Sequence, residues 1–164
     1  MKQNFIFAFA LLATLLMVNA APYQLDKRTI KFGKCPGEDG KLPLLDVTVS
    51  PDPLEKGKDF NVTVSGPLTV DIPENSMDWI RFFDKDYNPI SFFNFYGDFC
   101  YDQRHDIKCP VKAGTKFSTV LTGVFAPDGD VAATAAHLRV LIQDTNPEPD
   151  VDIACTMSEK IVLV

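Results

Sequence analysis

The sequence has 164 residues, of which 46% are apolar and 11% aromatic, and its formal net charge is −6. This composition is typical of one globular domain and excludes disordered, collagen-like and coiled-coil chains. An acidic chain without basic clusters also lacks the electrostatic footprint of a nucleic-acid-binding protein, and its net charge predicts no strong attraction to anionic bilayers.

Residues 1–20 have the pattern of a secretory signal peptide. Lys2 is followed by an uncharged stretch from Phe5 to Val18, and small residues precede Ala21. As a helix this stretch would span only about 21 Å, which is too short for a hydrocarbon core of ~30 Å. We therefore predict cleavage after Ala20 or Ala21 and a soluble protein of the secretory pathway, either secreted or in the lumen of a vacuole or lysosome.

Residues 21–28 form a possible propeptide. They end in the dibasic pair Lys27-Arg28, which resembles the sites that prohormone-type proteases cut in the fungal secretory pathway. The alternative is an exposed linker that is never cut. Cleavage would leave residues 29–164 as a single mature domain with 13 basic and 21 acidic residues, a net charge of −8.

Strand-length apolar segments recur through the rest of the chain at the spacing of an all-β domain. The segment Phe60 to Ser65 alternates strictly, which places Phe60, Val62 and Val64 toward a core and Asn61 toward water. Asn61-Val62-Thr63 is a glycosylation sequon, and its outward position predicts that Asn61 carries a glycan.

The predicted fold is a β-sandwich of seven or eight strands, because no long amphipathic helix interrupts the strand pattern. Turn signals rich in Pro, Asp, Asn and Gly separate the segments. The predicted strands are Leu42 to Val49, Phe60 to Ser65, Leu68 to Ile72, Asp78 to Phe83, Ile90 to Tyr96, Thr115 to Phe125, Ala136 to Gln143 and Val151 to Val162.

Two consecutive strands depart from a simple alternation. Residues 79–83 and 90–96 place large apolar side chains on both faces, although the outer face of a small sandwich is expected to be polar. Either a loop covers the outer face, or the strands surround an internal apolar cavity that holds a ligand. We expect the lining of such a cavity to come from Phe60, Val62, Val64, Leu68, Val70, Ile72, Phe117, Leu121, Leu138, Val140 and Ile142, with some of Trp79, Phe83, Phe92, Phe93 and Phe95.

Four cysteines allow three disulfide pairings. The sequence has no Cys-x-x-Cys ligand set for zinc, and an oxidising compartment favours disulfides. Cys100 and Cys109 bracket a polar stretch suited to an exposed loop, and a local bridge there would leave Cys35 to pair with Cys155.

The arrangement resembles the ML lipid-recognition family, in particular the fungal phosphatidylglycerol/phosphatidylinositol transfer proteins. The resemblance spans essentially the whole mature chain. It rests on Phe32-Gly33-Lys34-Cys35, Leu45 to Pro53 with Lys56-Gly57-Lys58, Phe99-Cys100, Cys109-Pro110-Val111 and Asp152-Ile153-Ala154-Cys155.

This resemblance implies an immunoglobulin-like sandwich whose two sheets separate to admit a lipid, with no cofactor, no metal and no chemistry. The implied ligand is a phospholipid, and the alternative is a sterol, although the animal sterol carriers resemble this sequence less. The implied protein is a monomer that contacts membranes transiently and moves single phospholipids between them.

Two other classes of protein remain as alternatives. An immunoglobulin adhesion module without lipid cargo would have two paired cysteines flanking a core Trp, which Trp79 matches weakly. A hydrolase would need an activated nucleophile and a base, but the sequence has no Gly-x-Ser-x-Gly motif and only His105 and His137 as imidazoles. We predict a non-enzyme in which both histidines and the spaced Asp pairs are surface and turn residues.

Overall fold

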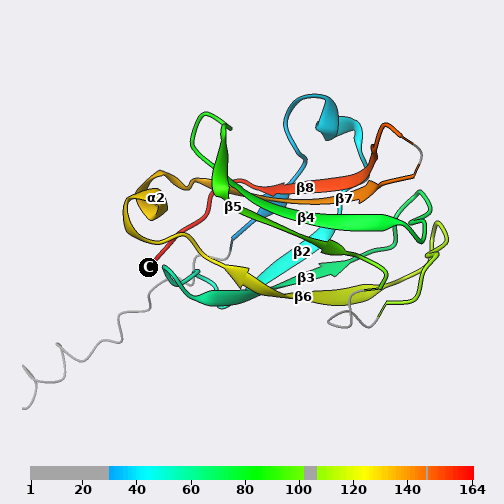
Figure 1. Cartoon of the computed structure of the whole chain (residues 1–164), viewed down its shortest axis with the longest axis horizontal. Coiled ribbons are helices and arrows are strands. Elements are labelled where there is room, and N and C mark those ends of the chain that lie inside the picture. The colour runs from blue at the N-terminus through cyan, green and yellow to red at the C-terminus, as the bar shows by residue number, and fades with distance from the viewer. Residues whose placement is uncertain (1–29, 102–106, 147) are drawn as a thin grey trace, which may run out of the picture.

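Two antiparallel sheets form a sandwich in the computed structural model, which describes residues 30–101, 107–146 and 148–164 (Figure 1). Residues 1–29, which include the predicted signal peptide and propeptide, lie outside the described residues. The first sheet has five strands in the order β1 (Phe32–Gly33), β8 (Val151–Ser158), β7 (His137–Asp144), β4 (Ser76–Phe83) and β5 (Pro89–Asp98).

The second sheet has three strands in the order β2 (Asp46–Ser50), β3 (Asp59–Ser65) and β6 (Ser118–Phe125). Within the described residues, two short helices accompany the sheets, the 3-10 helix η1 (Gly37–Lys41) and the α-helix α2 (Gly129–Thr134). This architecture confirms the β-sandwich that the sequence predicts. Among the described residues, no helix is long and apolar enough to cross a membrane.

Alternation along each strand builds the core between the sheets. Phe60, Val62 and Val64 of β3 are buried, whereas Asn61 between them is exposed on the outer face of the smaller sheet. From the larger sheet, Ile80 of β4 and the alternate residues Leu138, Val140 and Ile142 of β7 face them. Each sheet therefore contributes one apolar face.

The outer face of the larger sheet is covered by a segment of the chain. Trp79 and Phe83 lie on this face together with Cys155 and Met157, and they form a second, smaller cluster with Leu42. Residues 35–43 run over that cluster. The Cys35–Cys155 disulfide and an ion pair of 2.8 Å between Arg139 Nη1 and Asp39 Oδ2 hold them there. For β4, the explanation by a covering loop is thus the correct one.

The segment Leu68 to Ile72 is not a strand, contrary to the sequence-based prediction. It forms only an isolated bridge between Ile72 and Val111, and Gly114 donates a backbone hydrogen bond to the Leu68 carbonyl. Because its partner is an irregular segment rather than a neighbouring strand, the apolar alternation is not continued. Leu68 and Ile72 are buried, but Val70 points outward and is 39% exposed.

Both disulfides have the pairing that the sequence favours. Cys35 is joined to Cys155 across 120 residues, and Cys100 to Cys109 across nine. The first bridge fixes the covering segment to β8. The second closes the connection between β5 and β6 at one end of the sandwich, and residues 102–106 within that connection are outside the described residues.

Candidate functional site

A cleft opens where the two sheets meet along their edges. β5 ends the larger sheet and β6 ends the smaller one, so no ladder of hydrogen bonds joins these two fully described strands. The space between them, which we call the lateral cleft, has a volume of about 200 Å³. Its apolar lining residues are Ile80, Phe95, Leu121 and Val124, and its other lining residues are Asp78, Asn94, Tyr96, Thr122 and Gly123.

Aromatic rings lead from the mouth of the lateral cleft into the core. At the mouth, Phe95 of β5 stacks with Phe125 of β6, with ring centroids 6.4 Å apart. Deeper inside, Phe82 makes edge contacts with Phe93 at 6.4 Å and with Phe60 at 6.1 Å. Contact across the gap between the sheets therefore depends on side chains alone.

The lateral cleft is smaller than a typical ligand pocket, which occupies ~300 to 1,000 Å³. A lipid chain therefore fits only if the sheets separate. Since β5 and β6 share no backbone hydrogen bonds, separation at this margin costs side-chain contacts but no sheet pairing. The arrangement permits a closed form without ligand and an opened form with one.

Asp78 adds a carboxylate to the wall of the lateral cleft. It lies on β4 two residues before Ile80, and only 5% of its surface is exposed. The lateral cleft is thus lined by apolar side chains together with one largely buried carboxyl group.

Most of the predicted lining residues lie between the sheets. Those in the central cluster are Phe60, Val62, Val64, Leu68, Ile72, Leu121, Leu138, Val140 and Ile142, and Phe93, Phe95 and Phe117 pack against it while remaining partly exposed. Of this set, the lateral cleft brings together only Phe95 and Leu121. The predicted residues of the central cluster other than Leu121 are packed core, Phe93 packs at its margin, and Phe117 lines a second hollow described below.

Four predicted lining residues lie elsewhere. Val70 is on the surface, and Phe92 is 92% exposed because it is on the outer side of the edge strand β5. Trp79 and Phe83 pack on the outer face of the larger sheet, under the segment from residue 35 to 43. None of these four faces the space between the sheets.

Sequence reasoning missed Ile80, Asp78 and Val124. Alternation with Phe82 could have placed Ile80 and Asp78 inward, but the neighbouring aromatics dominate that segment. Val124 faces inward because Gly123 adopts a positive φ of 73° and the register with β3 shifts nearby, between Phe60 and Val62. A glycine within a predicted strand is the signal for such an irregularity.

A second hollow lies at the end of the sandwich near the Cys100–Cys109 disulfide. This end hollow has a volume of about 390 Å³. Its apolar lining consists of Ile107, Pro110, Val111 and Phe117, and its polar lining of Lys108, Lys112, Thr115, Lys116 and Ser118. Phe117 contacts the buried ring of Phe99 at 6.2 Å, which connects the hollow to the core.

The one described histidine, His137, makes two contacts with neighbouring residues. His137 stacks on Tyr87 at 4.6 Å, and its Nδ1 lies 3.0 Å from the carbonyl of Ser158. His105 lies outside the described residues. No group of three or more potential metal ligands is found in the described part of the chain.

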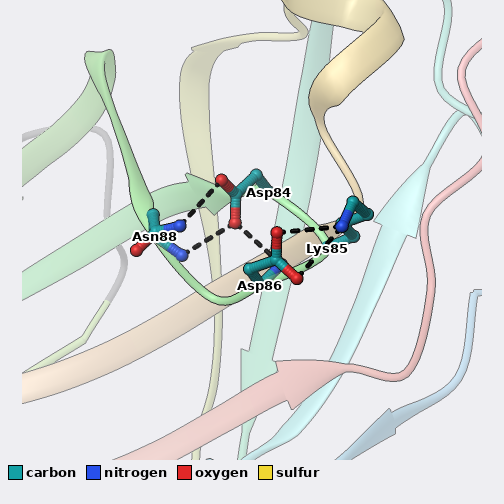
Figure 2. A network of polar contacts seen from close by, with 4 residues as sticks. All are labelled: Asp84, Lys85, Asp86 and Asn88. Carbon is teal, nitrogen blue, oxygen red and sulfur yellow. Dashed lines mark hydrogen bonds and ion pairs between the residues drawn. The ribbon is translucent and has the colours of Figure 1, made fainter.

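One of the spaced Asp pairs, Asp84 and Asp86, organises the tight turn between β4 and β5 (Figure 2). Asp84 accepts hydrogen bonds from the backbone N–H groups of Asp86 and Asn88 at 2.9 and 2.8 Å, and from the Asn88 side chain at 3.0 Å. Lys85 pairs with Asp86. The hydrogen bonds from Asn88 hold the pKa of the Asp84 carboxyl below its ordinary value. The pair therefore stabilises a turn.

Comparison with known proteins places this geometry in a wider context. Residues 29–157 match the family model described as ML domain. No curated protein matches the chain. A similar solved structure is the crystal structure of a Niemann-Pick type C2 protein from Japanese carpenter ant, which is 20% identical, with a TM-score of 0.51 over 78% of this chain and 96% of that chain. At this identity the similarity shows the shared fold.

Proposed function

This chain belongs to the ML domain family, and we propose that it carries single phospholipids between membranes with the acyl chains held between its two sheets. Family membership supports binding of a lipid or sterol. The finer assignment to phosphatidylglycerol or phosphatidylinositol is our proposal, supported by the sequence resemblance to the fungal transfer proteins.

The observation that carries the proposal is the lateral cleft. Its apolar wall continues into the core, and the two strands that flank it belong to different sheets. Separation of Phe95 from Phe125 would therefore open a path from solvent to the interior.

The energy of transfer is compatible with a carrier. Burial of a sixteen-carbon chain is worth roughly 12 kcal/mol at ~0.8 kcal/mol per methylene, and a bilayer supplies about the same amount. Exchange between membrane and protein is then close to balanced. Strands of eight residues, such as β4 and β6, extend about 26 Å, which exceeds the ~15 Å of half a hydrocarbon core.

The two disulfides support folding in an oxidising compartment, and we infer a site of action outside the cell or in the lumen of a lysosome or vacuole. We also infer that the protein acts as a monomer and without a cofactor.

Mass spectrometry of lipids extracted from the purified protein tests the proposal. Stoichiometric glycerophospholipid is the expected result. Stoichiometric sterol would replace the phospholipid carrier with a sterol carrier of the same fold. Absence of any bound lipid, together with failure to take lipid up from vesicles, would favour a recognition module. Turnover in a panel of ester and glycoside substrates would overturn the non-enzymatic assignment.

A further inference from the structure

We propose that the end hollow is the surface by which the protein docks on an anionic bilayer, with its lysines against the lipid phosphates. The inference deepens the proposed function, since it names the membrane surface that a carrier would meet. It concerns docking alone and is tested separately from lipid uptake.

The lysines around the end hollow concentrate positive charge in an acidic protein. Lys108, Lys112 and Lys116 are exposed and line one hollow that has no acidic lining residue, although the chain has a net charge of −6. Lys112 Nζ forms an ion pair of 2.8 Å with Asp71 Oδ2. Lys108 and Lys116 form no ion pair with a described carboxylate.

Two of the described acidic residues near this end, Asp71 and Asp98, are engaged by other groups of the chain. The Asp71 carboxylate is held by Lys112 and by the backbone N–H of Ala113 at 2.8 Å. Asp98 accepts the backbone N–H groups of Cys100 and Tyr101. The acidic loop between β7 and β8 projects from another corner of this end, apart from the segment that includes the lysines (Figure 1). Among the described residues, the lysines of the end hollow are therefore separate from the acidic loop between β7 and β8.

Apolar groups accompany the lysines. Ile107 and Val111 are buried at the floor of the end hollow, and Phe117 is partly exposed. On the adjacent segment Val70 is 39% exposed, and this segment is held next to the hollow by the bridge between Ile72 and Val111. Tyr101, 65% exposed, directly follows the disulfide-bonded Cys100. Basic and apolar side chains together are what an anionic membrane interface binds.

Charge complementarity decides the occupant. Lysine ammonium groups spread around an apolar floor, of which that of Lys112 is paired with Asp71, suit several head groups of a bilayer better than one phosphate ion, which is usually held by converging donors or an Arg fork. Each lysine near an anionic leaflet strengthens binding by roughly fivefold. The negative net charge of the chain predicts no strong attraction to anionic bilayers. A net charge is a sum over the whole chain, however, and it does not show that several lysines lie together at the end hollow.

Sedimentation of the full mature protein with vesicles tests the proposal. We compare vesicles of phosphatidylcholine alone with vesicles that also contain phosphatidylglycerol, at low and at physiological salt. Wild-type protein should bind the anionic vesicles preferentially. The variant Lys108→Gln/Lys116→Gln should bind them about 30-fold more weakly, because it loses two lysines near the surface. The matched control Lys34→Gln/Lys160→Gln removes the same charge from exposed residues elsewhere and should bind as wild type does.

Three results would overturn the docking surface. The first is equal binding of the wild-type protein to both kinds of vesicle, and the second is an equal loss of vesicle binding in the test and control variants. The third is release from the vesicles by inorganic phosphate at concentrations too low to change the ionic strength, which would indicate a discrete phosphate site. Preferential docking without any bound or transferred lipid would instead refute the carrier function and leave the docking surface in place. Both variants change exposed residues, and thermal unfolding checks that each is folded.

Discussion

Phe95 of β5 and Phe125 of β6 stack across the gap between the two sheets, with ring centroids 6.4 Å apart and planes inclined by 28°. The two strands share no backbone pairing, so this contact joins them by side chains alone, next to the lateral cleft that Phe95 lines. The pair holds the two sheets together at the point where a lipid chain would enter.

The substitution Phe125→Ala should therefore loosen the mouth. We expect faster exchange of a fluorescent lipid between protein and vesicles, measured by stopped flow, with a loss of about 1 kcal/mol in the free energy of unfolding from the lost aromatic pair. Phe92→Ala is the control, because Phe92 is also on β5 but is 92% exposed. Equal acceleration in both variants would show that the Phe95–Phe125 contact does not limit exchange.

A larger side chain in the lateral cleft should exclude lipid more than it destabilises the protein. Leu121 and Val64 of the adjacent strand β3 are both fully buried, but only Leu121 lines the cleft and so has free space beside it. We expect Leu121→Trp to reduce the amount of bound lipid per protein while changing the unfolding free energy little. Val64→Trp should cost about 1 to 3 kcal/mol through overpacking.

Chemical denaturation and lipid quantification on the two Trp variants together check this prediction. If Leu121→Trp is as destabilised as Val64→Trp and keeps its full lipid load, the cleft is ordinary core and not the place of the ligand.

The sandwich can be predicted from the sequence because most strands show an alternation of apolar and polar residues within a few neighbouring positions. Phe60, Val62 and Val64 alternate with polar residues, and the structure buries them as expected. The alternation of Leu68, Val70 and Ile72 has the same appearance, yet this segment pairs only with an irregular one. Periodicity shows which side chains face inward from a strand, but it does not show whether a partner strand exists.

The candidate site is less accessible to sequence reasoning, because it is formed by contacts between distant segments. Trp79 and Phe83 are apolar on the outer face because residues 35–43 cover them, and that cover depends on a disulfide to Cys155. The lateral cleft brings Phe95 of β5 next to Leu121 of β6, two strands that do not pair. Neither the covering of Trp79 and Phe83 nor the approach of Phe95 to Leu121 produces a pattern in the neighbouring sequence.

Removal of the Cys35–Cys155 bridge should destabilise the fold more than removal of the Cys100–Cys109 bridge. In the loop-entropy account, a loop of 120 residues is worth roughly 5 kcal/mol and one of nine residues somewhat less than 3 kcal/mol. The paired variants Cys35→Ala/Cys155→Ala and Cys100→Ala/Cys109→Ala are compared by urea denaturation. The opposite order of stability would mean that the covering segment contributes little to the larger sheet.

The turn between β4 and β5 should show a depressed carboxyl pKa. Hydrogen bonds from Asn88 lower the pKa of Asp84, and NMR titration of its carboxyl carbon should reveal this. In Asn88→Ala we expect the pKa of Asp84 to return toward its ordinary value. Because the folded-state pKa is lowered, the stabilisation is present above the unfolded-state pKa and is lost as the pH falls through the folded-state value. An unchanged Asp84 pKa in Asn88→Ala would refute the assignment of its cause.

Transfer of labelled phospholipid between vesicles tests the account most directly. Donor vesicles carry fluorescent phosphatidylglycerol or phosphatidylinositol with a quencher, and acceptor vesicles carry neither. Catalytic amounts of the folded protein should raise the rate of transfer in proportion to protein concentration, and Leu121→Trp should reduce it. A rate that stays at the spontaneous value with protein that remains folded, and that contains no extractable lipid, would contradict the carrier function.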